Sequence, residues 1–195
     1  LCNSVIVFDE VQSVPNTMLT LFNLTINFLV KKCHATVILC SATQPSFENA
    51  EHKLLSEVSD LITLPSETLK VFERVKLVDK GSMSMEELSD FALEIIKSKK
   101  SLLLVCNTKR EAKELFENLQ AEVNNTVPMY HLSASMCTKH RKMTVESMKS
   151  DLRLPDPKQI VCVATQVIEA GVDISFNCVI RLQAGMDSIV QAAGR

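Results

Sequence analysis

The sequence predicts an α/β fold in which parallel strands alternate with helices. Short apolar runs rich in Val, Ile, Leu and Cys recur at residues 4–9, 35–40, 101–107 and 159–165. Several stretches between them carry apolar residues at every third or fourth position, which is typical of amphipathic helices. Polar residues directly follow the apolar runs, and open α/β sheets build their sites at the carboxyl ends of parallel strands.

The first part of the chain begins with a predicted strand at 4–9, which precedes a largely buried helix from Asn16 to Lys32 and a second strand at 35–40. After a mixed stretch, a further strand is predicted from Val75 to Val78, and Gly81 interrupts the chain shortly afterwards. We place the domain boundary near Ser66, which divides the chain into residues 1–66 and 67–195.

The second part repeats the alternation of helix and strand. Thr108 is expected to cap a helix whose buried residues are Ala112, Leu115, Phe116 and Leu119. The other elements expected here are a helix at 84–98, strands at 101–107 and 127–133, a basic helix at 138–148, and strands at 159–165 and 178–182. This order predicts a parallel sheet covered by helices on both faces.

The bulk composition is that of a globular domain with an ample core. The chain has 195 residues, of which 46% are hydrophobic and 23% charged, and its formal net charge of -2 provides no global positive field. None of the seven cysteines forms a C-x-x-C pair, so we expect free thiols in a reducing cytoplasm. No signal peptide or membrane segment is predicted. The chain starts without Met and stops at Arg195 inside an apparent motif, so we interpret it as a piece of a longer protein.

Two groups of polar residues follow the first two strands. Asp9 and Glu10 form an adjacent carboxylate pair, in which one group can hold a hydrated Mg²⁺ and the other can polarise a water molecule. A solvated acidic pair that opens a loop is the alternative, and on its own it is the more common case. The segment Ser41-Ala42-Thr43 places two hydroxyl groups near this pair if the two strands are neighbours.

A third group follows the strand at 159–165, and a fourth ends the chain. Thr165 ends the strand, Gly171 permits close backbone approach, and Asp173 follows. Arg195 provides a planar fork suited to phosphate, although an arginine at a domain edge is normally a solvated charge.

Together these segments resemble the motifs of superfamily 2 helicases, whose two RecA-like domains bind ATP between them. SVIVFDEVQ looks like the Walker B motif, CSATQP like the coupling motif, ATQVIEAGVD like the fifth motif and QAAGR like the start of the sixth. The chain also resembles the CRISPR-associated helicase–nuclease of type I systems. The resemblance lies in the segments DEVQSVP, LCSATQP, YHLSASMC, TQVIEAGVDISF and GMDSIVQAAGR. The resemblance covers nearly the whole chain. It implies the end of a first RecA-like domain followed by most of a second.

The resemblance also implies roles for individual residues. Asp9 would coordinate Mg²⁺–ATP, and Glu10 would act as the base that positions the attacking water. Gln12 departs from the His or Asp often found at its position, but it can still hydrogen-bond to the loop that contains Ser41, Ala42 and Thr43. The residues expected to touch the DNA backbone are Asn107, Thr108, Lys109 and Thr165. Those expected to approach the nucleotide or its phosphates are Gly171, Asp173, Gln191 and Arg195.

The implied parent protein is a cytoplasmic, ATP-dependent DNA helicase of antiviral defence. It would be recruited by a CRISPR surveillance complex of the Cascade type, act on single-stranded DNA of a target R-loop, and pass that strand to a nuclease domain in the same chain. None of the four glycines precedes a lysine, so the phosphate-binding Gly-Lys-Thr/Ser loop is absent from these residues. We therefore expect the 195 residues alone to be inactive.

Two alternatives remain open at this point. One is another superfamily 2 helicase acting on DNA or RNA. The other is a non-catalytic scaffold that keeps the helicase fold only to bind nucleic acid or protein. The presence of Asp9, Glu10 and Arg195 argues against the scaffold, because a scaffold has no need of them.

Overall fold

The computed structural model describes residues 1–195 apart from 42–46, 48–49, 72, 124–126, 155–158 and 169–172. The chain divides into two compact units, Leu1–Arg74 and Val75–Arg195. The predicted boundary near Ser66 coincides with the start of the short helix α2 (Ser66–Val71), which belongs to the first unit.

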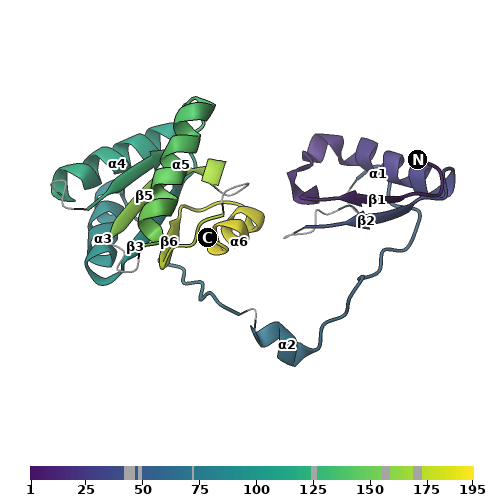
Figure 1. The fold of residues 1–195 in the computed structure, drawn as a ribbon, viewed down its shortest axis with the longest axis horizontal. Coiled ribbons are helices and arrows are strands. Elements are labelled where there is room, and N and C mark those ends of the chain that lie inside the picture. Colours follow the sequence, from purple (N-terminus) through teal and green to yellow (C-terminus); the bar gives the residue numbers. More distant parts are fainter. Residues whose placement is uncertain (42–46, 48–49, 72, 124–126, 155–158, 169–172) are drawn as a thin grey trace. The chain divides into compact units, whose positions relative to one another are not determined.

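The first unit is built on two parallel strands and one long helix (Figure 1). Strand β1 (Val5–Phe8) pairs with β2 (Thr36–Leu39) in a register that runs from Val5 opposite Thr36 to Phe8 opposite Leu39. Helix α1 (Leu19–Lys31) connects the strands and follows a 3-10 turn at Asn16–Met18. The two strands and the helix predicted in this region are therefore confirmed. The expectation that this helix is largely buried is wrong, because Leu21, Leu24 and Phe28 are exposed.

One face of this small sheet is packed against the end of the helix. Leu29 of α1 lies in a buried cluster with Cys33 and Ala35, and Ile6 and Phe8 pack against that cluster. On the other face of β1, Val5 is 66% exposed and Val7 57% exposed. The apolar sequence of β1 is thus buried on one side and open on the other.

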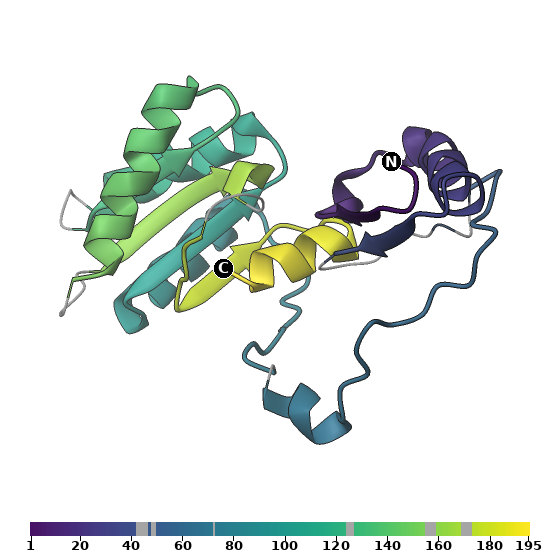
Figure 2. The same cartoon turned by 45° about the vertical axis from the view of Figure 1, so that its right-hand side comes forward.

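The second unit contains a four-stranded parallel sheet in the order β4-β5-β3-β6 (Figure 2). Its strands are β3 (Ser101–Cys106), β4 (Met129–Leu132), β5 (Ile160–Thr165) and β6 (Cys178–Arg181). The two central strands, β3 and β5, are buried at every position. The predicted α/β class is confirmed, and so is each of the four strands.

Helices cover both faces of this sheet, as predicted (Figure 1). Alternate residues of β3 supply the two cores: Leu104 lies in the cluster with helices α3 and α4, whereas Leu103 and Val105 lie in the cluster with Met148 of α5. The helices of the unit are α3 (Met85–Ser98), α4 (Lys109–Val123), α5 (Thr138–Leu152) and α6 (Met186–Ala193).

The expected strand from Val75 to Val78 is wrong. Residues 73–84 have neither helix nor strand, and the side chains of Val75 and Leu77 are 55% and 60% exposed. A strand needs a hydrogen-bonding neighbour, and none of the paired strands in the described residues lies beside this segment. Helices α2 and α6 were not predicted. Within the described part of the chain, no helix is both long and apolar enough to cross a lipid bilayer.

Candidate functional site

The carboxyl end of β1 holds the acidic pair in a defined turn. The backbone N–H of Glu10 donates to Oδ1 of Asp9 over 2.9 Å, and Glu10 itself adopts a left-handed conformation with φ 55° and ψ 44°. A 3-10 turn at Val11–Ser13 follows, in which the Ser13 hydroxyl donates to the Glu10 carbonyl over 2.6 Å. This turn sends the chain away from the strand and leaves the carboxylates of Asp9 and Glu10 at the strand end, where both residues are exposed.

Gln12 connects this acidic pair to the end of the neighbouring strand. Its Nε2 donates to Oε2 of Glu10, and its Oε1 accepts a 2.8 Å hydrogen bond from the hydroxyl of Ser41. The backbone N–H of Val11 also donates to the carbonyl of Cys40 over 3.2 Å. The hydrogen bond that we expected between Gln12 and the loop is therefore present. Ala42 and Thr43 of the same loop lie outside the described residues.

The acidic pair could provide the one or two protein ligands that a magnesium site usually has. Mg²⁺ prefers oxygen ligands and commonly keeps several waters, so one or two carboxylates plus substrate phosphates are enough to hold it. Asp9 offers such a carboxylate, because its backbone-bonded Oδ1 leaves the other oxygen for a ligand. In the described part of the chain, no group of three or more His, Cys, Asp or Glu side chains forms a dedicated metal centre.

In the second unit, several predicted residues share the carboxyl edge of the sheet. Thr165 ends β5 and lies opposite Cys106 of β3, which is followed by Asn107 and Thr108. The Thr165 side chain is buried, and its hydroxyl has no hydrogen-bond partner among the described residues. Lys109, the first residue of α4, is exposed beside this edge. The edge thus gathers hydroxyl, amide and ammonium groups.

Thr108 caps α4, as predicted from the sequence. Its Oγ1 accepts the N–H of Glu111 over 3.1 Å, and Oε2 of Glu111 accepts the N–H of Thr108 over 2.9 Å. This reciprocal arrangement is a capping box, which satisfies N–H groups that the first turn of a helix leaves without partners. The Thr108 hydroxyl still has its own proton, which it can donate to an outside acceptor.

The residues expected near the nucleotide come from the last part of the chain. Asp173 is exposed, whereas Gln191 on α6 and Arg195 are half-buried. The carbonyl oxygen of Arg195 accepts the backbone N–H of Phe176 over 2.7 Å, which ties the end of the chain to the segment that carries Asp173. Gly171 lies outside the described residues.

Sequence reasoning missed Arg181, which ends β6 and reaches the same carboxyl edge. Its Nη1 donates to Oδ1 of Asn107 over 2.7 Å, and its Nη2 donates to the hydroxyl of Ser188 over 2.8 Å. A signal for it was available, because an arginine inside an apolar strand segment must find hydrogen-bond acceptors when it is partly buried. The sequence pattern predicts CVIRL only as the last strand.

Two buried thiols of the central strands are held in the neutral form. Burial raises the pKa of Cys106 to about 12; the nearby carboxylate of Glu111 adds to this rise, and the Arg181 guanidinium opposes it. Burial also raises the pKa of Cys162. A thiol must lose its proton to act as a nucleophile or a metal ligand, so these cysteines act as small apolar core residues. All seven cysteines are free, although Cys2 and Cys137 are exposed rather than buried.

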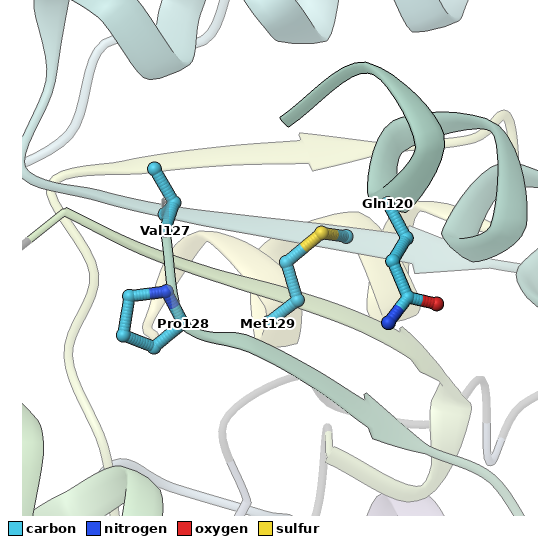
Figure 3. A pocket seen from close by; sticks show the side chains of 4 residues that line it. All are labelled: Gln120, Val127, Pro128 and Met129. Atoms are coloured by element: carbon cyan, nitrogen blue, oxygen red, sulfur yellow. The ribbon is translucent and has the colours of Figure 1, made fainter. Parts of the chain in front are cut away.

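A pocket of about 190 Å³ lies away from these groups, at the amino end of β4 (Figure 3). Its lining consists of Gln120, Val127, Pro128 and Met129. No charged side chain lines it, so it lacks the groups that would bind a phosphate or catalyse hydrolysis. The candidate site is therefore the set of strand ends, and this pocket is separate from it.

The chain is similar to known proteins along nearly its whole length. The family model described as CRISPR-associated nuclease/helicase Cas3, C-terminal, matches residues 98–195. The CRISPR-associated nuclease/helicase Cas3 of Methanothermobacter thermautotrophicus is 27% identical over 198 residues, which cover 97% of this chain and 23% of that protein. The chain thus spans about a quarter of the length of the curated relatives that it matches along its whole length.

Solved structures show the same fold. The T. fusca Cas3-ATP crystal structure superposes with a TM-score of 0.72 at 19% identity, over 98% of this chain and 27% of that one. The Mycobacterium smegmatis helicase Lhr bound to ssDNA and AMP-PNP gives a TM-score of 0.57 at 17% identity, over 98% of this chain and 26% of that one.

Proposed function

The chain belongs to the family of the CRISPR-associated nuclease/helicase Cas3 C-terminal region, and from this premise we propose that it forms part of an ATP-dependent DNA motor. The motor would couple ATP hydrolysis to the unwinding of target DNA for degradation in antiviral defence. The observation that carries this proposal is the hydrogen-bonded chain from Glu10 through Gln12 to Ser41. These hydrogen bonds connect a carboxylate suited to water activation to the end of the neighbouring strand. A movement of the carboxylate therefore shifts the hydrogen bonds at that strand end.

In the proposed mechanism, the first unit handles the chemistry of hydrolysis. Asp9 would hold Mg²⁺ through its carboxylate, and the ion would supply positive charge beside the phosphates of ATP. Glu10 accepts a hydrogen bond from the attacking water and orients it toward the terminal phosphate. Gln12 fixes the Glu10 carboxylate by donating from Nε2, while its Oε1 holds Ser41. The loop containing Ser41, Ala42 and Thr43 then transmits the state of the nucleotide.

The second unit supplies contacts to DNA and to the nucleotide. We assign contact with the DNA backbone to the edge formed by Asn107, Thr108, Lys109 and Thr165, because hydroxyl, amide and ammonium groups are typical phosphate ligands. Such contacts do not read bases, so binding would be tolerant of sequence. The residues assigned to the nucleotide and its phosphates are Gly171, Asp173, Gln191 and Arg195.

The proposed partners follow from the family. The motor would act in the cytoplasm on the single-stranded DNA of an R-loop opened by a Cascade-type surveillance complex. A nuclease domain in the same full-length protein would receive the strand. The T. fusca relative is a Cas3-ATP structure, which supports ATP as the nucleotide.

The decisive experiment measures ATP hydrolysis by the full-length protein with and without single-stranded DNA, beside its Glu10→Gln variant. The amide keeps the size of the side chain but is far less basic than the carboxylate, so we expect the stimulated rate to fall by about 10² to 10³-fold. Glu57→Gln is the matched control, because Glu57 is exposed in the same unit and lies outside the site. Its rate should equal that of the unaltered protein.

Other outcomes separate the alternatives. Stimulation by RNA but not DNA would move the assignment to another helicase branch. No hydrolysis under any condition would favour a scaffold. The 195 residues alone should turn over ATP very slowly, because they contain no Gly-Lys-Thr/Ser segment. Rapid turnover by this chain that disappears in Glu10→Gln would contradict that expectation.

A further inference from the structure

Arg181 makes an unusually complete set of hydrogen bonds at the carboxyl edge of the second sheet. Its Nη1 donates to Oδ1 of Asn107 over 2.7 Å, to the carbonyl of Leu182 over 2.9 Å and to the carbonyl of Val105 over 3.3 Å. Its Nε and Nη2 both donate to the hydroxyl of Ser188, over 3.2 and 2.8 Å. One half-buried guanidinium thus reaches β3, the residue after β6, and α6 at the same time.

The Asn107 side chain is occupied inside the protein at both ends of its amide. Its Oδ1 accepts from Arg181, and its Nδ2 donates to the carbonyl of Gln183 over 2.8 Å. The second N–H of Nδ2 is left for an outside acceptor, because an amide nitrogen carries two donors. The side chain therefore bridges the end of β3 to the segment after β6 and can still donate to a phosphate.

Ser188 is the point at which Arg181 holds helix α6. It is 8% exposed and lies in the first turn of the helix, two positions after Met186. The same helix carries Gln191 and ends two residues before Arg195. Because a guanidinium is a rigid planar fork, fixing it against β3 also fixes the direction of the helix that it holds.

We infer that Arg181 is a positioning residue that couples the edge carrying Asn107, Thr108 and Lys109 to helix α6. This inference rests on the proposed function, which assigns that edge to DNA and Gln191 and Arg195 to the nucleotide. A displacement of the edge by bound DNA is transmitted through the Arg181 fork to α6. Arg181 itself touches neither ligand, and the Asn107 side chain takes part by holding the fork.

The first test replaces Arg181 with Met in the full-length protein and measures ATP hydrolysis against the concentration of single-stranded DNA. The change keeps a long side chain but removes every donor of the fork. We expect the maximal stimulation by DNA to fall about tenfold, which is within the usual range for coupling between two sites. The DNA concentration for half-maximal stimulation should change less than about twofold, because no DNA contact is lost. Arg153→Met is the matched control, since Arg153 is exposed at the end of α5, and its stimulation should be unchanged.

The double variant Asn107→Ala with Arg181→Met adds a second measurement. If Asn107 acts through Arg181, the double variant loses no more stimulation than Arg181→Met alone. Additive losses would overturn the inference. An increase in the half-maximal DNA concentration of Arg181→Met, with the maximum unchanged, would also overturn it, because that pattern indicates a direct phosphate contact.

Hydrogen exchange distinguishes failure of this inference from failure of the proposed function. In Arg181→Met, amides of α6 and of residues 105–108 should exchange faster together, while those of α3 keep their protection. Unchanged protection in α6, or a uniform loss across the second unit, would overturn the positioning role whatever the hydrolysis rates are. Absence of DNA stimulation in the unaltered protein would instead reject the proposed function and leave this exchange result to decide the inference.

Discussion

The two sheets of this protein have equally apolar strands but very different surroundings. In the second unit, every residue of β3 and β5 is buried between helices on both faces. In the first unit, α1 packs on one face of the sheet, and Val5 and Val7 of β1 point away from that face and are largely exposed. An apolar run therefore indicates a strand of a parallel sheet, whereas its burial depends on which elements cover it.

Two helices of the second unit begin with a capping motif that α1 lacks. Helices α3 and α4 start with reciprocal capping boxes, Ser84 with Glu87 and Thr108 with Glu111. Helix α1 starts at Leu19 with no side-chain cap from Met18 and instead continues a 3-10 turn. Helices α5 and α6 of the second unit likewise begin without a side-chain cap, so burial distinguishes the units better than capping does. The complete burial of β3 and β5 predicts that the second unit is the more sensitive to core substitutions.

The largest expected effect is on the core of the second unit. Leu104 on β3 is fully buried, so Leu104→Ala should lower the free energy of unfolding of that unit by about 3 kcal/mol through lost burial and a residual cavity. Native-state hydrogen exchange is the appropriate measurement, because it reports on each unit separately.

A matched valine pair makes the comparison between the units direct. Val163→Ala on buried β5 should cost about 2 kcal/mol, whereas Val7→Ala on β1 should cost less than about 0.5 kcal/mol, since Val7 is 57% exposed. Equal costs would show that the open face of β1 is covered in solution, and the contrast between the two units would then fail.

Substitution of the helix caps should have an intermediate effect and should separate structure from function. Ser84→Ala and Thr108→Ala each remove a hydroxyl that accepts the N–H of the third helical residue, so each should lower stability by about 1 kcal/mol. Denaturant unfolding measures this loss. Only Thr108→Ala should also weaken DNA binding, because Thr108 lies at the proposed DNA edge. Equal weakening by Ser84→Ala would remove Thr108 from the DNA contacts.

The ionisation of Tyr130 should be visible by spectroscopy. Burial, followed by the 2.5 Å hydrogen bond from its hydroxyl to Oδ2 of Asp151, raises the pKa of Tyr130 to about 12. Because the folded pKa is raised, this contribution to stability is complete below about pH 10 and is lost as the pH rises toward 12.

Ultraviolet titration of the 195-residue chain measures this shift, since the chain has one Tyr and no Trp. In Asp151→Asn the midpoint should fall but stay above the ordinary value, because burial is the larger cause. Asp90→Asn, at an exposed position on α3, should leave the midpoint unchanged. A midpoint near the ordinary value in the unaltered chain would mean that β4 and α5 are not tied together through Tyr130.

Much of the fold could be predicted because local signals coincide with packing. The apolar run at 101–107 became β3, and Thr108 became the cap of α4. The run from Val75 to Val78 also contains apolar residues but has no strand beside it, and pairing partners cannot be deduced from a run of four residues. Helix α6 was missed because we had interpreted its residues only as a motif.

The candidate site was predictable in its residue types but not in its connections. Gln12 was recognised as able to reach the loop after β2, and the structure supplies the hydrogen bond to Ser41. Arg181 was missed because two of its partners, Val105 and Asn107, lie 76 and 74 positions away in the sequence. Contacts of this kind are set by sheet order, which places β6 beside β3, and not by local spacing.

The left-handed backbone of Glu10 has a consequence for how the protein would evolve under selection. A non-glycine residue at φ 55° costs about 1 kcal/mol, and glycine or asparagine would relax it. Selection of variants for heat resistance alone should therefore enrich glycine or asparagine at position 10. Selection for a working motor should restore glutamate, and alternating the two pressures should make position 10 switch back and forth.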